Sequence, residues 1–268
     1  MKRLLVALLV IFIAAIAALT LIRRGATQPS LQAPGSSLPR TPDGQPDLNG
    51  VWQVLTTASW DIQDHPAKLG VPAGQGVVEG DEIPYQPWAL AKKQENFKNR
   101  LTADLVEARG FLPGVPRIMY MPLPFQIVQT PKYVTMVYEY GHAVRVIYTD
   151  GTKHPEGPIE FWLGDSRGRW EGDTLVSDVV HFNAETWFDK AGNFHSEALH
   201  LVERFTMVGP DHINYEVTIE DPKVFTRPWK MSMPLYRRKE PNVRILEYEA
   251  GALMEEDAEK PEEQIKGK

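Results

Sequence analysis

Residues 168 to 183 read GRWEGDTLVSDVVHFN, and the alternation within them indicates the fold class. Thr174 to Val180 have the β-branched composition of a half-buried β-strand, yet a carboxylate, Asp178, lies among them. Side chains alternate between the two faces of a strand, so Asp178 shares a face with Val176 and Val180. Because these neighbours are apolar, we expect Asp178 to point inward and to be hydrogen-bonded there.

The same period of two continues on both sides of this stretch. Strands are expected at residues 133–140, 143–150, 159–163, 173–182, 198–208, 212–220 and 229–236, and a further strand begins at Gly50. Turn signals such as Asp150-Gly151, Gly164 to Gly168 and Gly209-Pro210-Asp211 separate them. The pattern predicts a mainly β protein in which about eight antiparallel strands form a meander, closed or nearly closed as a β-barrel.

Segments of different composition flank the β-barrel-like domain, which we place at residues 48–250. Residues 25–47 are rich in Pro, Gly and Ser and predict a flexible tether. One accessory helix is expected over about residues 88–109, with Gly110 as its C-cap. Residues 251–268 are acidic with few apolar side chains, which is typical of a disordered tail.

The N-terminus carries a targeting segment within residues 1–24. Residues 4–22 form an apolar stretch of 19 residues with basic residues on both sides. A cleavable signal has an apolar region of about 7–15 residues, whereas a membrane span needs about 20. We therefore favour an uncleaved signal anchor, a transmembrane helix, over a cleaved signal peptide. Either one places the domain in the cell envelope, at the periplasmic or extracytoplasmic face, or in the secreted fraction.

Composition excludes several classes of function. The net charge of −6 supplies no basic footprint for nucleic acid. The chain has no cysteine, so disulfides and thiolate metal sites are ruled out. His154, His181 and His195 show no ligand spacing, and no glycine motif for nucleotides is present. We expect neither a metal nor a cofactor, and the oligomeric state stays open.

Four segments carry a resemblance to known proteins. They read PRIMYMPLPFQIVQTPKYV (116–134), VRVIYTDG (144–151), WLGDSRGRWEGDTLVSDVVHFNAETWFDKAGNFHSEALHLVERF (162–205) and EVTIEDPKVFTRPW (216–229). The block resembles a widespread group of exported bacterial proteins of unknown function that share the WEGDTLV segment. The resemblance implies an exported β-rich domain and brings no established reaction. Members often carry a cysteine just before PGVPR, where this chain has Gly110 and Phe111. Gly50-Val51-Trp52 also resembles the Gly-x-Trp signature of lipocalins (calycins).

Two carboxylates stand out in the predicted strands. Glu203, like Asp178, lies on the more apolar face of its strand. Burial disfavours a charged carboxylate unless a cation or hydrogen-bond donors compensate. Three interpretations stay open: structural ion pairs with Arg145, Arg169 or Arg204, polar anchors for a ligand, or the acid and base of an active site.

The connection between strands 173–182 and 198–208 adds a histidine and several aromatic residues. Trp187, Phe188 and Phe194 suit a flap over the barrel mouth, or a plug that fills one end of the core. Under a flap, His195 is the natural general base, because a histidine ordinarily titrates near neutrality.

These observations define the candidate residues and the hypotheses. The predicted catalytic residues are Asp178, His195 and Glu203, and the predicted ligand-binding residues are Trp187, Tyr138, Tyr148, Arg145, Trp170 and Phe205. The favoured hypothesis is a binding protein for a small hydrophobic ligand, such as a lipid, isoprenoid or aromatic molecule, held in the barrel cavity. The alternatives are a cofactor-independent isomerase, lyase or hydrolase acting on such a ligand, and an envelope interaction module without a pocket.

Overall fold

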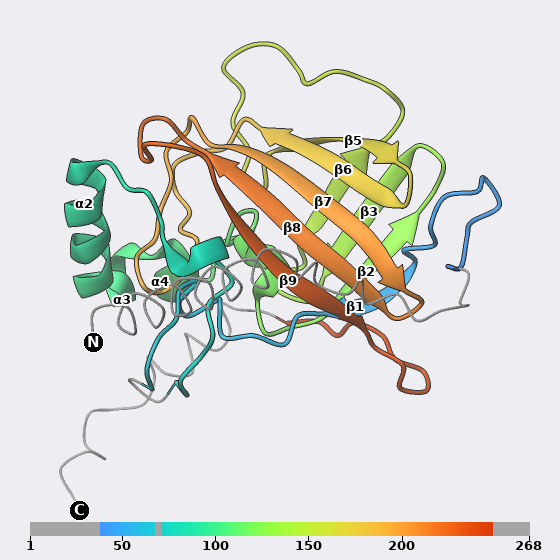
Figure 1. The fold of residues 1–268 in the computed structure, drawn as a ribbon, viewed down its shortest axis with the longest axis horizontal. Coiled ribbons are helices and arrows are strands. Elements are labelled where there is room, and N and C mark those ends of the chain that lie inside the picture. Colours follow the sequence, from blue (N-terminus) through green and yellow to red (C-terminus); the bar gives the residue numbers. More distant parts are fainter. Residues whose placement is uncertain (1–37, 68–70, 249–268) are drawn as a thin grey trace, which may run out of the picture. The chain divides into compact units, whose positions relative to one another are not determined.

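Nine β-strands form a closed barrel in the computed structural model, which describes residues 38–67 and 71–248. They are β1 (Gly50–Gln53), β2 (Phe125–Gln129), β3 (Tyr133–Tyr138), β4 (Val144–Tyr148), β5 (Asp165–Glu171), β6 (Thr174–Val180), β7 (His200–Gly209), β8 (His212–Glu220) and β9 (Trp229–Arg237). Strands adjacent in sequence pair with each other, and β9 returns to β1 (Figure 1). The predicted mainly β fold and its barrel are therefore confirmed. The predicted signal anchor, most of the tether and the acidic tail lie outside the described residues.

Alternate residues of each strand face the barrel interior. On β7, β8 and β9 the inward side chains that are completely buried include Leu201, Phe205, Tyr215, Val217, Ile219, Met231 and Leu235. Partly exposed, mostly polar residues occupy the positions between them. This alternation is the signal from which the strands were predicted, and burial of the apolar face is the main favourable term in folding.

The barrel closes where β1 meets β9, and the Gly-x-Trp motif lies at this closure. The guanidinium of Arg237 in β9 lies over the ring of Trp52 in β1, 4.3 Å from its centroid. Gly50 has a φ of +135°, and a Cβ atom there would collide with Arg237. Trp52 also donates from Nε1 to the carbonyl of Leu48 at 2.8 Å. The glycine and the tryptophan are therefore both needed for the arginine to close the barrel.

The predicted strand pattern is wrong around residues 149–171. Residues 159–163 form no strand and make only an isolated bridge between Phe161 and Phe182. β5 occupies the segment that we predicted as a turn, Gly164 to Gly168, because it pairs with β6 over seven residue pairs. β4 and β5 are consequently parallel, joined by just two residue pairs. β2 was also not predicted.

The accessory helix is broken into three. They are α2 (Pro87–Lys98), α3 (Arg100–Ala103) and α4 (Leu105–Arg109), and single 3-10 turns lie at η1 (Glu79–Asp81) and η2 (Arg117–Tyr120). The break before α4 comes from Asp104, which accepts a hydrogen bond from the Val106 amide and so caps a new helix. Gly110 ends α4 in the left-handed conformation, as predicted.

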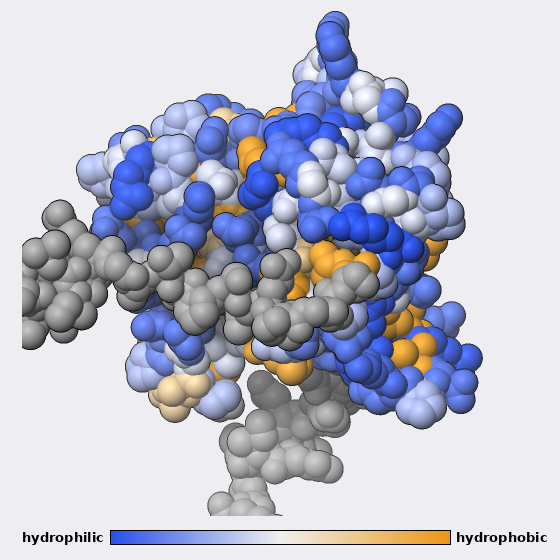
Figure 2. All heavy atoms as spheres, turned by 45° about the vertical axis from the view of Figure 1, so that its right-hand side comes forward, coloured by the Kyte–Doolittle hydropathy of each residue, from blue (hydrophilic) through white to orange (hydrophobic). Residues whose placement is uncertain are grey.

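The outer surface is mainly hydrophilic. On the face shown in Figure 2, hydrophobic residues form small separate patches between charged and polar ones. Within residues 38–67 and 71–248, no helix has the length and apolar character that crossing a membrane requires.

Candidate functional site

An ion pair lies inside the barrel. Arg145 of β4 and Glu203 of β7 are 1% and 0% exposed, and the guanidinium donates to both carboxylate oxygens. Tyr215 of β8 donates to the same carboxylate at 2.8 Å. The hydroxyls of Ser166 and Ser177 accept from Arg145 at 3.0 Å and 3.5 Å. Five strands thus contribute to one buried polar network.

This network confirms that Glu203 points inward and pairs with Arg145. Burial alone would lower the pKa of Arg145, but the facing carboxylate outweighs burial and raises this pKa above its ordinary value. Burial raises the pKa of Tyr215, so its hydroxyl stays protonated and donates. The groups satisfy one another, so the network is a closed structural unit and offers no free acid or base.

Asp178 lies on the outer surface of the barrel, so the prediction that it points inward is wrong. Its side chain is 35% exposed, whereas Leu175, Ser177 and Val179 are buried on the inward face of β6. Val176 shares the outward face and is nevertheless buried. Ser177 accepts a hydrogen bond from Arg145 in the interior, so the face of β6 that carries Ser177 points inward. The apolar pattern had indicated the opposite face.

Two histidines share the Asp178 carboxylate. His154 contacts Oδ1 and His200 of β7 contacts Oδ2, each through Nε2 at 2.9 Å. The other nitrogen of His154 lies 2.6 Å from Asp165 of β5, and that of His200 lies 3.3 Å from Glu220 of β8. Asp165 in turn pairs with Arg167 at 2.7 Å. Cations and carboxylates therefore alternate across four neighbouring strands.

The geometry of this cluster shifts the pKa values of Asp178 and His200 in opposite directions. Partial burial would raise the pKa of Asp178, but hydrogen bonds from His200 and His154 hold it below its ordinary value. Partial burial would lower the pKa of His200, yet Asp178 and Glu220 raise it above the ordinary value. A histidine with a carboxylate at each nitrogen makes both hydrogen bonds only when both nitrogens carry protons. Neither ring has a free nitrogen to act as a base.

A cleft of about 310 Å³ lies beside this cluster. Its lining includes Val180, His181 and Phe182 at the end of β6, residues 197–200, and residues 157–160 of the β4–β5 connection. His200 therefore belongs both to the charged cluster and to the cleft.

His195 and Trp187 lie in the β6–β7 connection, away from both carboxylates. The His195 ring is buried, with Nδ1 2.9 Å from the carbonyl of Ser196 and Nε2 2.7 Å from the hydroxyl of Thr186. Burial lowers its pKa, so the neutral ring donates to the carbonyl and accepts from the hydroxyl. Trp187 is also buried and bridges to Phe194. This arrangement favours the plug over the flap.

The predicted ligand-binding residues are divided between the two faces of the barrel. Tyr138 and Phe205 are buried inside; the Tyr138 hydroxyl contacts two methionine sulfurs, and Phe205 packs on Tyr215. Trp170 packs against the same core. Tyr148 lies outside, beneath the guanidinium of Arg167, which is 4.5 Å from its ring centroid. The structure thus brings Arg145 and Glu203 together, but it does not bring Asp178, Glu203 and His195 together.

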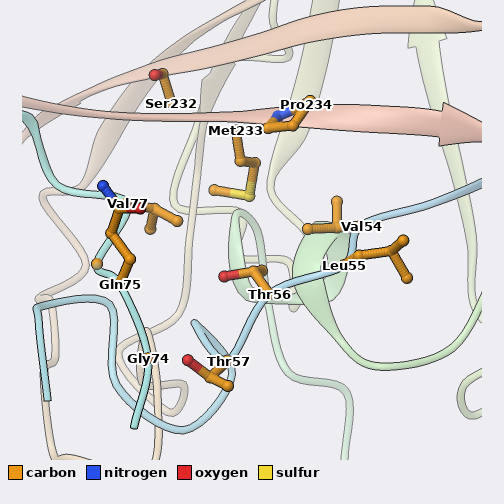
Figure 3. A pocket seen from close by; sticks show the side chains of 11 residues that line it. Val54, Leu55, Thr56, Thr57, Gly74, Gln75, Val77, Ser232, Met233 and Pro234 are labelled. Atoms are coloured by element: carbon orange, nitrogen blue, oxygen red, sulfur yellow. The ribbon is translucent and has the colours of Figure 1, made fainter. Parts of the chain in front are cut away.

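A second cavity, of about 410 Å³, opens at the seam between β1 and β9. β1 pairs with only Tyr236 and Arg237 of β9, and the rest of β9 is bordered by residues 54–57 and 74–78. We call the cavity lined by Val54, Leu55, Thr56, Thr57, Gly74, Gln75, Gly76, Val77, Ser232, Met233 and Pro234 the seam pocket. In Figure 3, the Met233 side chain points from β9 towards Thr56 and Val54.

Two glycines allow the seam pocket to form. His65 and Gly74 exchange backbone hydrogen bonds of 3.1 Å and 3.0 Å, and a Cβ atom at Gly74 would collide with Thr57. A Cβ atom at Gly76 would come within 2.6 Å of the Asp64 nitrogen. On the other side, Ser232 donates from its backbone to Val77 at 2.9 Å. Because glycine has no Cβ atom, both residues allow the backbone segments beside β9 to pack closely.

The positions of His154, His200 and the seam residues were not predicted from the sequence. If Ser177 is assigned to the interior, strand alternation places its neighbour Asp178 on the outward face. His200 is then also an outward residue. Nothing in the sequence indicates that His154, in a long connection, reaches Asp178. Within the described ranges, no three His, Cys, Asp or Glu side chains are arranged to hold a metal ion.

Comparison with known proteins adds no family: no protein-family model, curated protein or solved structure matches the chain.

Proposed function

We propose that this protein binds a small, uncharged, mainly apolar molecule in the seam pocket. The observation that carries the proposal is the lining of this pocket: aliphatic side chains and a methionine, with threonine and serine hydroxyls, a glutamine amide and no charged side chain. Its volume of about 410 Å³ falls within the range of small-molecule sites, roughly 300–1,000 Å³.

The chemistry of the lining defines the ligand class. Leu55 is an exposed large hydrophobic residue at the rim, and Val54 and Met233 are buried below it. Methionine is flexible and polarisable, so Met233 can adapt to the shape of an apolar ligand. The hydroxyl of Thr56 suits one polar end, such as an alcohol or a carbonyl, whereas the hydroxyl of Thr57 bonds to His65 at 2.9 Å. These features support a lipid-like, isoprenoid or aromatic ligand, held at the seam of the barrel wall.

We also propose that the protein works in the cell envelope. The apolar stretch at residues 4–22 and its basic flanks support export and anchoring at the membrane. The lipocalin-like Gly-x-Trp motif at the barrel closure supports the proposed binding of a small molecule. Together these features support a small-molecule carrier or sensor on an anchored β-barrel. Nucleic acid is not expected as a partner, because the net charge is −6.

Filling the seam pocket should weaken ligand binding. The probe is N-phenyl-1-naphthylamine, a neutral apolar fluorophore, titrated against the unit Ser36–Lys268, which holds all nine strands. We expect saturable binding to the wild type. Thr56→Phe places a ring in the pocket that Figure 3 shows, and should weaken binding by about tenfold or more, corresponding to about 1.4 kcal/mol.

The matched control is Thr102→Phe, a threonine exposed on α3 that does not line the pocket. It should leave the affinity unchanged. Equal affinity of Thr56→Phe and the wild type would locate the probe elsewhere, and the absence of saturable binding to the wild type would refute the proposal.

A further inference from the structure

Residues 150–164, which make up all but the first residue of the connection between β4 and β5, form a long loop above β5 and β6 in Figure 1, and we call them the strap. Its residues 157–160 line the cleft of about 310 Å³, opposite Val180, Phe182 and Leu199. Most of the strap is exposed. A segment with so little buried surface stays in place only through specific contacts.

Two histidines supply the contacts of the middle of the strap, while Arg167 donates to Thr152 near its start at 2.6 Å and Trp162 packs on Phe111 near its end. His154 of the strap lies between Asp165 and Asp178, at 2.6 Å and 2.9 Å. His181, at the end of β6, contacts the carbonyl of Pro155 at 3.0 Å through Nε2, and its own carbonyl accepts from the Phe161 amide at 2.8 Å. His181 has a φ of +64°, a left-handed conformation that is strained for a histidine. The strap contacts restrain this residue, so their loss would allow it to relax.

We propose that the strap is a pH-dependent cover of the cleft: the contacts of His154 with Asp165 and Asp178 latch it onto β5 and β6 while the histidine–carboxylate cluster keeps its protons, and the strap is released when the cluster loses them as the pH rises. This inference concerns a different cavity from the seam pocket and does not depend on the proposed ligand.

Charge balance explains the latch. The charged and titratable groups that face it are Asp165 and Arg167 of β5, Asp178 and His181 of β6, His200 of β7 and Glu220 of β8, while Lys153, Glu156 and Glu160 of the strap are exposed. With both histidines protonated, three cations (Arg167, His154 and His200) balance three carboxylates. After deprotonation, one cation faces three carboxylates, and a nitrogen lone pair points at a carboxylate oxygen.

The sign of the pH dependence follows from the two shifted groups. Because the pKa of His200 is raised, its contribution is complete below the ordinary histidine range and is lost as the pH rises through the raised value. Because the pKa of Asp178 is lowered, its contribution is lost only in strong acid. The strap should therefore be closed in mild acid and open in mild alkali.

Hydrogen–deuterium exchange with mass spectrometry tests the proposal on the full chain in a mild detergent. Protection factors, normalised to the unfolded chain at each pH, are compared at about pH 5.5 and about pH 8.5, on either side of the histidine range. Strap peptides that contain the Phe161 amide should lose about tenfold of their protection at the higher pH, equivalent to about 1.4 kcal/mol. Peptides from β3 and β9, which carry no residue of the cluster, should keep their protection at both pH values, and this controls for global unfolding.

Variants distinguish the latch from a general pH effect. His154→Gln should show low strap protection at both pH values, and Asp178→Asn should do the same because the shared carboxylate is lost. His212→Gln removes a histidine of β8 that packs on Tyr236, outside the cluster, and should keep the wild-type pH dependence. The proposal is overturned if wild-type strap protection does not depend on pH, or if His154→Gln keeps the full dependence.

Discussion

Replacing Glu203 by glutamine should lower the free energy of unfolding by about 3–5 kcal/mol, because it leaves a buried guanidinium without its counter-ion. Arg145 is 1% exposed, so water cannot take the place of the lost carboxylate. Its remaining acceptors, the glutamine amide oxygen and the hydroxyls of Ser166 and Ser177, carry no charge. Tyr215 would also lose the charged acceptor of its hydroxyl. Urea unfolding followed by tryptophan fluorescence measures this loss.

Two further variants separate the ion pair from other effects of the substitution. Glu216→Gln makes the same chemical change on the outward face of β8 and should shift stability by less than about 0.5 kcal/mol. The double variant Arg145→Met with Glu203→Leu should be less destabilised than Glu203→Gln, because no unpaired charge remains inside. A loss from Glu203→Gln no larger than that from Glu216→Gln would show that the ion pair does not hold the barrel together.

The same variant also distinguishes the two possible ligand sites. A ligand anchored inside the barrel would lose affinity in folded Glu203→Gln. The seam pocket is lined by other residues, so its affinity for the neutral probe should be unchanged wherever the variant is folded. The structure favours the second outcome, since the interior carboxylate is fully occupied by Arg145 and Tyr215.

Asp178 and Glu203 show when an apolar pattern identifies the inward face of a strand and when it does not. Both share a face with valine, leucine or phenylalanine in the sequence, and only Glu203 is inside. On β6, the inward face contains the polar Ser177, and the outward face contains Val176, which is buried in register between Arg169 and Arg204. Long arginine stems can cover apolar surface, so an outward valine need not be exposed. The pattern is ambiguous where a polar network is built into the core.

The strand prediction for the β4–β5 region is wrong for a related reason. Residues 159–163 are apolar except for Glu160 and resemble a strand, but Pro155, Gly157 and Pro158 precede them and the chain passes outside the sheet. The Gly- and Arg-containing β5 is a strand only because β6 pairs along its whole length. Contacts between residues distant in sequence determine that residues 159–163 form no strand and that β5 does. Such contacts also bring His154 next to Asp178. Strands β7 to β9 were predictable because periodicity and turns agree there.

Replacing Asp104 by asparagine should be the second large loss, about 3–5 kcal/mol, because it breaks another buried ion pair. Arg117 of η2 and Asp104 are each 1% exposed, and Arg117 Nη1 donates to the two carboxylate oxygens at 3.0 Å and 2.9 Å. Glu107, at 3.5 Å, is the remaining acidic partner of Arg117. The same carboxylate caps α4 through the Val106 amide, and the amide oxygen of asparagine can keep this cap, so the loss reports on the ion pair.

An ion pair with exposed side chains is the control for this prediction. Arg40 and Asp173 are joined at 2.6 Å, but their side chains are 46% and 41% exposed, so Asp173→Asn should cost no more than about 1 kcal/mol. Both substitutions remove one carboxylate charge, and thermal or urea unfolding compares them directly. Equal effects would mean that burial does not determine the strength of these pairs. A large difference would mean that Asp104 and Arg117 join α4 to η2, which precedes the barrel strands β2 to β9.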